Sequence, residues 1–485
     1  MNHLTSAGRR PPGRRLRRGG RAVVLGTALA CAAAPALVST SAHAALQGRA
    51  DGRSITAPSP TTAAATSSGQ SAAAGRSKPT ATAHRLDART QALMKRQAAL
   101  LPVAGKLLAA RARAGSDIAG VTIDVAAGRV DVYRTHPAAS AGVALPKGVT
   151  LVTHRAAYSA GQLTASTRKI QSQSRTLASQ GVRVAAVSAR EDGSGLDVTV
   201  LAATAGLPSL KGPAAAKAPR ALSADASRAV LRSAYDGVVA SVSTTATATP
   251  AHPYYAGWRF NDYSPWYGGD RILEGCTTGF PAIYNGAMKM MTAAHCGGNG
   301  TVFHNGPNSS GGWGTLGSVV YNNGNTDIAV IDVASSVNSI NVGPAQNSSI
   351  RAVAAWEHPV VGSYLCQSGS YTGETCGLRV VDTNQSQCIS WFLWWCTSYQ
   401  QPMTDVVNSA GSGSYAAGHG DSGAPVYWYD AVGNVHAVGQ VHGQLFPNAR
   451  AAYPAYFTDT MWCPAPEGWQ QRCSAGFSLA QMPGY

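Results

Sequence analysis

Basic residues are scarce in the later half of this chain, although the 485-residue sequence carries a formal net charge of +16. Only seven of the 39 Lys and Arg residues follow Pro250, against 13 of the 23 Asp and Glu residues. The formal net charge of the later half is therefore −6. The first 250 residues, with 32 basic and ten acidic residues, have a formal net charge of +22. Nucleic-acid binding depends on basic side chains that neutralise phosphates. We therefore expect no nucleic-acid partner.

Long apolar runs are absent after the first 44 residues, where AVVLGTALACAAAPALV stands between RRPPGRRLRRGGR and the small-residue site SAHA. This order is typical of a signal peptide, residues 1–44, and predicts a secreted, extracellular protein. The paired arginines leave the export route open. Cys31 offers a lipoprotein alternative, which Ala28 disfavours because such sites usually have Leu there. No later run approaches the ~20 apolar residues that span a bilayer, so we expect no membrane association after signal cleavage.

Cysteine is absent between Cys31 and Cys276, and the remaining eight cysteines all lie in the later half. An even number in an exported chain argues for disulfide bonds. Sequential proximity favours four short loops: Cys276 with Cys296, Cys366 with Cys376, Cys388 with Cys396, and Cys463 with Cys473. Metal binding is the alternative, but there is no C-x-x-C pair and no histidine at ligand spacing. We expect neither a metal nor another cofactor.

The first half divides by composition. Residues 45–85 contain too few large apolar residues to offset the entropy of ordering, and we expect them to be disordered. Residues 86–205 show two helical patterns, the second with a capping box at Ser159 and Gln162 and with Gly181 after its last turn. They also show two hairpin patterns, so we predict a small α+β domain. Residues 206–253 are expected to be a linker that contains the maturation site.

The predicted α+β domain has no recognisable active site, because His136 and His154 stand alone and no Ser or Thr has a base nearby in the sequence. It lies between the signal peptide and the Thr/Ala/Pro-rich stretch TTATATPAHP. This position favours a removable pro-segment. A retained accessory domain is the alternative.

Apolar runs become short in residues 254–485, where MKMMTAA, DIAVIDV, GLRVVD, APVYWY and HAVGQV are separated by Gly- and Asn-rich clusters. Such runs predict an all-β fold. The length is enough for two small antiparallel barrels, and a cleft between them would be a natural place for chemistry.

Three short stretches supply what acyl transfer requires: His295 in MTAAHC, Asp327 in NTDIAVIDV and Ser422 in GHGDSGAPV. A serine hydroxyl becomes a good nucleophile when an imidazole accepts its proton and a carboxylate orients that imidazole. The glycines around Ser422 allow a tight turn that aims the N–H groups of Gly420 and Ser422 at a developing oxyanion. We predict His295, Asp327 and Ser422 as the catalytic residues.

Other residues compete for these roles. Asp332 lies five residues beyond Asp327, on the opposite face of the same expected strand. The histidines that compete as the base are His419, His436 and His442. We expect His419 to be a pocket or surface residue, since it stands in a glycine turn.

The motifs TAAHC, DIAV and GDSGAPV, in this order, resemble those of chymotrypsin-fold serine proteases, the trypsin-like S1 family. The stretches GDRILEGCTTGF, CQSGSYTGETCG and AVGQVHG resemble the secreted bacterial streptogrisin-like branch, over roughly residues 258–456. The resemblance implies two six-stranded antiparallel β-barrels and a pro-region that aids folding and temporarily inhibits the protease. It also implies that His295 is the general base, Asp327 orients it and Ser422 is the nucleophile. Asp421 would hold the oxyanion turn through an internal ion pair.

Departures from the family pattern concern the substrate groove. Ala424 replaces a second glycine, and there is no activation site of the Arg-Ile-Val-Gly-Gly kind. His442 stands where the family usually has Ser, followed by Gly443 and Gln444, which we expect to pair with an extended substrate. His442 is expected to border the specificity pocket, to touch the Asp327 side of the triad or simply to pack.

The floor of the specificity pocket is expected to come from Ala416 and Ala417, which are small and uncharged. A preference for Lys or Arg would require a carboxylate there. We therefore expect an apolar or aromatic residue before the scissile bond, with an acidic residue as the alternative that His442 leaves open.

The stretch CISWFLWWC places four aromatic residues in a loop between Cys388 and Cys396. Such a loop either packs in the interior or forms an exposed patch for a partner. The second reading supports an alternative function, a catalytically silent secreted binding protein. An esterase is disfavoured because the G-x-S-x-G elbow is missing. The expectation is a monomeric, secreted serine endopeptidase with polypeptide substrates and its own pro-region as a partner.

Overall fold

The computed structural model describes residues 86–137, 142–202, 219–235, 237–245, 258–260, 262–307, 313–346, 348–410, 416–418, 420–444, 455–459 and 477–479. All of them belong to one compact unit, residues 75–485. The expected signal peptide, the expected disordered segment, His419, Cys463 and Cys473 lie outside the described residues. None of the described helices is long and apolar enough to cross a membrane.

The N-terminal region begins with a long helix and a three-stranded sheet: α1 (Ala88–Arg111), β1 (Ile118–Asp124), β2 (Arg129–Arg134) and β3 (Thr150–Arg155). β1 and β2 form the expected antiparallel hairpin, and Gly128 has a positive φ of 64° in its turn. β3 adds to β2 in parallel, which the sequence did not indicate. Helix α1 buries one face, with Leu100, Ala104 and Leu107 at most 1% exposed.

A second sheet follows: α2 (Ala160–Ser172), α3 (Ser174–Ser179), β4 (Val184–Ala189), β5 (Leu196–Leu201), α5 (Ala224–Ala234) and β6 (Val239–Thr245). The capping box at Ser159 and Gln162 is present. The helix that the sequence predicts up to Gly181 is interrupted at Gln173, which separates α2 from α3. The strands of this region belong to two different sheets, because β1-β2-β3 form a sheet of their own and β6-β5-β4 lie at the end of a larger one.

The expected linker, residues 206–253, contains regular structure and corrects the sequence-based boundary. Ser223 caps α5, whose Leu231 is fully buried, and β6 pairs in parallel with β5. The helix has few large apolar residues and the strand VASVSTT is rich in Ser and Thr. These segments look like low-complexity linker because their stability comes from the packing of α5 on β6 and the pairing of β6 with β5, rather than from strong local patterns.

The later region is built almost entirely from strands, as expected. Its elements are η1 (Trp258–Phe260), β7 (Trp266–Gly268), β8 (Arg271–Ile272), β9 (Cys276–Thr277), β10 (Pro281–Tyr284), β11 (Ala287–Thr292), η2 (Ala294–Cys296), β12 (Val302–Pro307), β13 (Trp313–Asn323), β14 (Ile328–Val333), β15 (Ser336–Val342), β16 (Ser349–Trp356), β17 (Tyr364–Gly369), β18 (Gly373–Phe392), β19 (Trp395–Asn408), β20 (Pro425–Tyr429), β21 (Val435–Gln444), β22 (Ala455–Asp459) and β23 (Phe477–Leu479). One sheet has six strands in the order β12-β13-β14-β11-β10-β23. A second sheet has 12 strands and includes β4, β5 and β6 of the N-terminal region. Closure into two six-stranded barrels stays a prediction from the resemblance.

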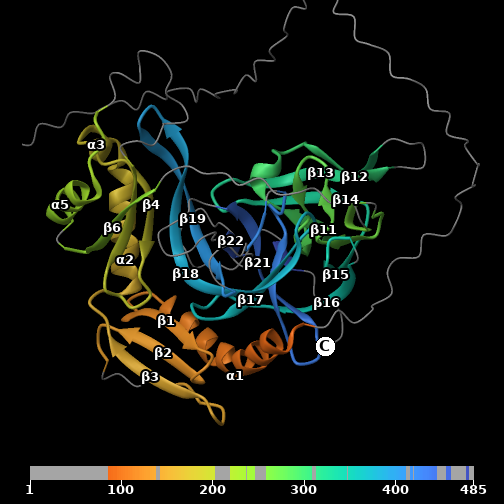
Figure 1. The fold of residues 1–485 in the computed structure, drawn as a ribbon, viewed down its shortest axis with the longest axis horizontal. Helices are drawn as coiled ribbons and strands as arrows, with labels where there is room; N and C mark the ends of the chain where they lie inside the picture. The colour runs from red at the N-terminus through yellow and green to blue at the C-terminus, as the bar shows by residue number, and fades with distance from the viewer. Residues whose placement is uncertain are drawn as a thin grey trace, which may run out of the picture. The chain divides into compact units, whose positions relative to one another are not determined.

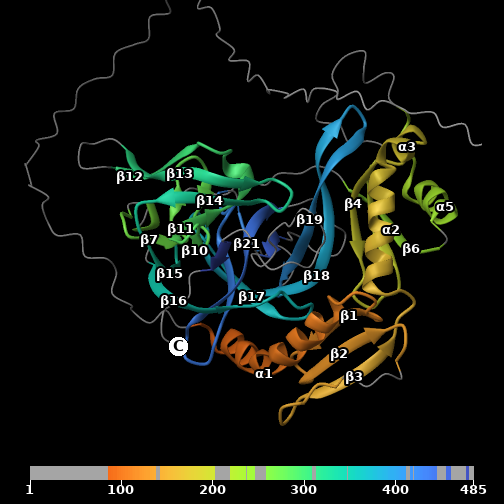
Figure 2. The same ribbon diagram turned by 180° about the vertical axis from the view of Figure 1, so that it is seen from behind.

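The N-terminal region joins the later region through a shared sheet edge. Strand β4 pairs antiparallel with Gln385–Gln387 of β18, and both views show β4 beside the long β18–β19 hairpin (Figures 1 and 2). Helix α1 contributes Met94 and Leu101 to the apolar cluster that contains Tyr427 and Val426 of β20. The two regions therefore share both backbone hydrogen bonds and a hydrophobic core.

Candidate active site

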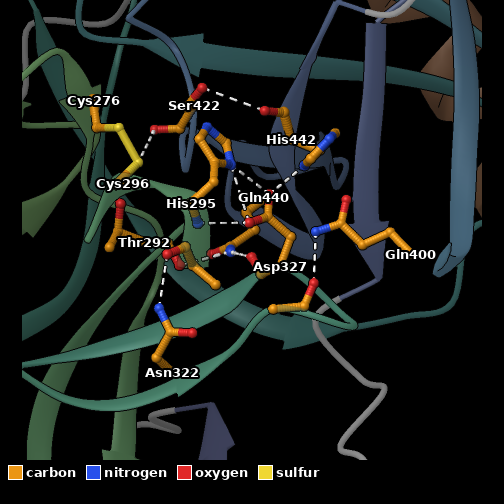
Figure 3. Close-up of polar contacts among 12 residues, drawn as sticks. Cys276, Thr292, His295, Cys296, Asn322, Asp327, Gln400, Ser422, Gln440 and His442 are labelled. Atoms are coloured by element: carbon orange, nitrogen blue, oxygen red, sulfur yellow. Dashed lines mark hydrogen bonds and ion pairs between the residues drawn. A yellow bond between two sulfur atoms is a disulfide. The ribbon is translucent and has the colours of Figure 1, made fainter. Parts of the chain in front are cut away.

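The three residues expected to carry catalysis come from three distant segments that meet in one place (Figure 3). His295 lies in η2, directly after the buried end of β11. Asp327 stands directly before β14, and Ser422 lies in the turn before β20. β11 and β14 are neighbours in the six-stranded sheet, with Met291 opposite Val330, which brings η2 and the turn before β14 together.

Asp327 has a left-handed backbone, with φ at +54°, which is uncommon for a residue other than glycine. Strain of this kind is kept only where surrounding contacts fix it. The contacts here are hydrogen bonds to the Asp327 carbonyl, from the Ala294 N–H at 3.1 Å and from the Gln440 side-chain amide at 2.9 Å. They hold the carboxylate, which is 1% exposed, against the histidine segment.

His295 contacts the Asp327 carboxylate through its ring and through its backbone. Its Nδ1 lies 3.0 Å from Oδ1 and 2.9 Å from Oδ2, and its backbone N–H donates to Oδ1 at 2.9 Å. An ionised carboxylate only accepts, so Nδ1 carries the proton and Nε2 keeps its lone pair. Desolvation lowers the pKa of His295, but the hydrogen bond and the charge of Asp327 outweigh it and leave that pKa raised.

Ser422 lies beside the His295 ring, which stands between Ser422 and Asp327 (Figure 3). The Ser422 hydroxyl donates to the backbone carbonyl of His442 at 3.3 Å, and it makes no hydrogen bond to His295 within the described part of the chain. Contacts of this kind are often long without substrate and tighten in the complex. The arrangement brings a hydroxyl, an imidazole and a carboxylate together in the order that proton transfer requires.

The turn around Ser422 offers two backbone donors. The N–H groups of Gly420 and Ser422 donate to none of the residues that the structure describes. Gly420 has a φ of +91°, and a Cβ there would lie 2.4 Å from the Tyr371 ring. Gly423 has a φ of +90°, and its Cβ would meet the Thr277 carbonyl oxygen at 2.3 Å. Only glycine fits these two positions, and this explains why the turn contains so many glycines.

Asp421 corrects one expectation, because no cation among the described residues pairs with it. Its buried carboxylate accepts from the Thr372 hydroxyl and from the backbone N–H groups of Tyr371, Thr372 and Gly418. Burial raises the pKa of Asp421, although these hydrogen bonds lower it in part. The fully buried Arg259 instead donates to Ser348 and to two backbone carbonyls. Backbone donors therefore replace the expected ion pair in holding the turn.

His442 touches the triad from a third side. Its Nδ1 contacts Asp327 Oδ2, and its ring meets the His295 ring edge-on, with centroids 5.2 Å apart (Figure 3). The sequence left open whether His442 borders the pocket, touches Asp327 or only packs, and the structure shows contact with Asp327. Burial raises the pKa of Asp327, but the charge of His442 and the hydrogen bonds from both histidines lower it more, and the net shift is downward.

Two of the competing residues, Asp332 and His436, lie away from the triad. Asp332 is half exposed and pairs with Lys289 on the other face of β14, as alternation predicts. His436 contacts Glu357 at 3.1 Å and Asp430 at 3.7 Å, and it makes no contact with Asp327.

The structure describes all of the expected substrate-binding residues except His419. Ala416 and Ala417 are buried, at 0% and 2% exposure. Gly443 and Gln444 pair with β22 on one edge of β21. On the other edge, the pairing with β20 ends at Gln440, so no described strand covers Gly443 and Gln444 there. This open edge is where an extended chain could pair.

Two positioning residues escaped the sequence analysis. The fully buried Gln440 donates its side-chain amide to the Thr292 and Asp327 carbonyls, at 2.8 and 2.9 Å. Asn322 donates to the Ala294 and Gly297 carbonyls on either side of His295. A polar residue inside the apolar run AVGQV was the one available signal for Gln440, but its partners are more than 100 residues away.

Three of the four expected disulfides are formed: Cys276–Cys296, Cys366–Cys376 and Cys388–Cys396. Two groups of metal-type side chains include these oxidised cysteines, which offer no free thiolate. The third group is His295, Asp327 and His442, whose facing atoms are engaged with one another. These are the three such groups among the residues that the structure describes.

The aromatic loop at the tip of the β18–β19 hairpin is only partly covered. Phe392 is 55% exposed and Ile389 is 41% exposed. On its other side, Arg175 lies over the Trp395 ring, and the Cys396 N–H donates to the Ser174 hydroxyl. The loop therefore packs on α3 of the N-terminal region through one face and exposes the other.

Known proteins resemble the later region. Residues 263–461 match the trypsin family model. Solved structures with similarity include protease A of Thermobifida fusca (22% identity, covering 40% of this chain and 90% of that chain, TM-score 0.30) and a protease from Nocardiopsis (23%, 40% and 91%, TM-score 0.30). A glutamic acid-specific serine protease with a histidine triad in substrate binding matches at 23% identity, covering 40% of this chain and 93% of that chain, with a TM-score of 0.30. No curated protein matches the sequence. Residues 263–461 thus form a trypsin-family domain with the mostly β, chymotrypsin-like fold of serine proteases.

Proposed function

We propose that this protein is a secreted serine endopeptidase that is made as a pro-enzyme. The observation that carries the proposal is the contact between His295 Nδ1 and the buried Asp327 carboxylate, with Ser422 on the other side of the ring. A binding protein of the same fold would gain nothing from a strained aspartate held in this way.

In the proposed mechanism, His295 Nε2 takes the Ser422 proton as Oγ attacks the scissile carbonyl carbon. The N–H groups of Gly420 and Ser422 then stabilise the oxyanion. His295 returns its proton to the leaving amine, and an acyl-enzyme remains on Ser422. Water activated by His295 attacks the acyl-enzyme, and Ser422 is released with its proton restored.

We further propose a preference for apolar or aromatic residues before the scissile bond. The buried Ala416 and Ala417 support this preference, because they offer no charge at the expected pocket floor. The acidic alternative depended on His442 as a cation at the pocket wall. Since the His442 Nδ1 contacts Asp327, the geometry favours the apolar preference.

The N-terminal region is proposed to act as a pro-region that aids folding and inhibits the protease until its removal. Its contacts with the protease domain support this role. Gln97 of α1 exchanges two hydrogen bonds of 2.8 Å with the backbone of Tyr364, and β4 extends the sheet through β18. These contacts bury the edge of β18 against the N-terminal region.

Labelling with a fluorophosphonate probe tests the activity directly. The secreted protein, freed from its N-terminal region, is expected to be labelled and to digest casein, while Ser422→Ala abolishes both. The exposed Phe392 favours a second candidate, a catalytically silent binding protein. Absence of labelling and of casein cleavage in correctly folded protein would reject the endopeptidase and leave this candidate.

A further inference from the structure

Arg259, in η1 at the start of the later region, is 1% exposed. All three nitrogens of its guanidinium donate hydrogen bonds: Nε to the Ser348 hydroxyl at 2.7 Å, Nη1 to the Gly369 carbonyl at 2.8 Å and Nη2 to the Gly343 carbonyl at 2.8 Å. The Arg259 carbonyl accepts from the side-chain amide of Asn305 at 2.8 Å. Arg259 is therefore held through both its side chain and its main chain.

A buried guanidinium costs free energy unless its N–H groups are bonded and nearby charges compensate it. The hydroxyl and carbonyl acceptors of Arg259 supply the hydrogen bonds. Desolvation lowers the pKa of Arg259, and the charges of four nearby acidic groups oppose this effect, those of Tyr427, Glu374, Asp270 and Asp421. Arg259 thus places a positive charge in the part of the interior that also holds the buried carboxylate of Asp421.

The Gly369 carbonyl connects Arg259 to the turn that holds Asp421. Gly369 is the last residue of β17, and the N–H groups of Tyr371 and Thr372, just beyond it, each donate to Asp421 Oδ1 at 3.2 Å. A Cβ at Gly369 would lie 2.0 Å from the same oxygen. The Asp421 carboxylate therefore packs directly against the backbone that Arg259 holds, and a shift of this backbone must move Asp421.

Asp421 stands between the two proposed oxyanion donors, the N–H groups of Gly420 and Ser422. A second connection runs through Thr277, whose hydroxyl donates to the Gly420 carbonyl at 2.8 Å and lies 2.7 Å from the Ser370 hydroxyl. A hydroxyl has one proton, so Ser370 is the donor to Thr277. The turn after β17 and the turn around Ser422 are therefore linked twice, and a displacement of the first is passed to the second.

We propose that Arg259 is a positioning residue for the two oxyanion donors, and that the active protease keeps η1 after the N-terminal region is removed. The hydrogen bond from Arg259 to Gly369 holds the backbone against which Asp421 packs. Asp421 in turn fixes the N–H groups of Gly420 and Ser422 on either side of it. This inference rests on the proposed endopeptidase activity and on the proposed pro-enzyme.

The same contacts assign the N-terminal end of the active enzyme. Arg259 precedes the trypsin-family match, residues 263–461, but its four bonding partners all lie inside it. A cut after Arg259 would leave the buried Gly343 and Gly369 carbonyls without these donors, which is costly. The cut therefore falls before Trp258, as the maturation segment expected from the sequence, residues 206–253, allows.

Steady-state kinetics on a peptide substrate tests the positioning role in the matured secreted protein, as wild type, Arg259→Met and Arg259→Lys. A change in the oxyanion donors acts on the transition state, so for Arg259→Met we expect kcat to fall about 10- to 100-fold and KM to stay within about twofold. Lysine keeps the charge but not the planar fork, so Arg259→Lys should lose less. Arg379→Gln changes an exposed arginine of β18 and is the control, with an unchanged kcat.

Three outcomes count against the proposal. An unchanged kcat in folded Arg259→Met would reject the positioning role, and Arg259→Lys decides in the same way if the methionine variant does not fold. A higher KM with an unchanged kcat would assign Arg259 to substrate binding. An active mature protein whose first residue lies after Arg259, as read by intact mass and N-terminal sequencing, would show that η1 is dispensable.

Hydrogen exchange without substrate separates this inference from the proposed function. In the full-length Ser422→Ala protein, we expect Arg259→Lys to accelerate exchange at the N–H groups of Tyr371 and Thr372 by about tenfold, the effect of weakening local stability by about one hydrogen bond. Arg379→Gln should not change it. Equal exchange in all three proteins would overturn the inference, even in an active protease. Faster exchange in Arg259→Lys alone, in a protein whose wild-type form no fluorophosphonate labels, would keep the link from Arg259 to Asp421 and reject the endopeptidase.

Discussion

Asp327 joins the two halves of the candidate site, since its carboxylate accepts from His295 and His442 while its carbonyl accepts from Gln440. Replacement by asparagine keeps the size of the side chain but turns one carboxylate oxygen into an N–H₂ group, which donates hydrogen bonds and does not accept them. The oxygens that accept from the two rings are then no longer both present. For Asp327→Asn we expect a loss in kcat of about 10⁴, as is typical when the imidazole takes the wrong tautomer. Steady-state kinetics on a peptide substrate measures the loss.

The matched control for this change is Asp332→Asn on the same strand, whose carboxylate pairs with Lys289 away from the site. Its kcat should stay close to the wild-type value. A loss of less than tenfold in Asp327→Asn would mean that Asp327 does not orient the base.

Gly420 allows a second test, because its replacement puts a methyl group against an aromatic ring. A Cβ at Gly420 would lie 2.4 Å from Tyr371, so Gly420→Ala must shift the turn and its N–H groups. We expect the fluorophosphonate labelling rate to fall by about 10² or more, the effect of losing one oxyanion donor.

Gly433→Ala is the control, since Gly433 has a similar φ of +88° but open space around its Cβ position. It should cost about 1 kcal/mol of stability from backbone strain and leave labelling unchanged. Equal labelling losses in the two variants would attribute the effect to stability rather than to the oxyanion turn.

Helix α1 and strand β4 show how elements far apart in sequence come to share one sheet and one core. Gln97 is fully buried and satisfies both the N–H and the C=O of Tyr364. Gln97→Ala leaves these two backbone groups without partners, so we expect a loss of about 1–3 kcal/mol in the free energy of unfolding. Denaturant unfolding of the full-length Ser422→Ala protein measures this loss, and hydrogen exchange at Tyr364 localises it.

Gln91→Ala on the exposed side of the same helix serves as the comparison and should change stability by no more than about 0.5 kcal/mol. If both variants behave alike, the two hydrogen bonds of Gln97 do not hold the N-terminal region to the later region.

Elements with strong local patterns were predicted well. The hairpin β1–β2 and the capped start of α2 follow from alternation and from the Ser159–Gln162 box. β14 and β20 follow from short apolar runs. The parallel strands β3 and β6 were missed because parallel pairing leaves no local turn signal.

The junction of the two regions should give the whole molecule a pH-dependent stability. Burial raises the pKa of Asp382 in β18 to about 6, a shift opposed by the Ser188 and Asn384 hydrogen bonds and reinforced by the charges of Glu191 and Asp197. A carboxyl with a raised pKa binds more protons in the folded state than in the unfolded state, whose value is about 3.9. Its contribution to stability is therefore full below pH ~4, and it declines as the pH rises through about 6.

Thermal unfolding of the full-length Ser422→Ala protein between pH 4 and 7 measures this decline. Asp382→Asn should reduce the slope of Tm against pH, while the exposed Asp332→Asn should keep it. A slope that does not change in Asp382→Asn would assign the pH dependence to other groups, such as the buried Asp405, whose pKa is also raised by burial.

By itself, the sequence determined the β-rich protease region, the three short-loop disulfides and the identity of the candidate catalytic residues, because these depend on local patterns and short spacings. Only the tertiary structure decided that His442 meets Asp327, that backbone N–H groups hold Asp421 and that β4 extends the protease sheet. Each of these contacts joins segments about 50 to 200 residues apart, and no local pattern specifies which buried donor will meet which acceptor.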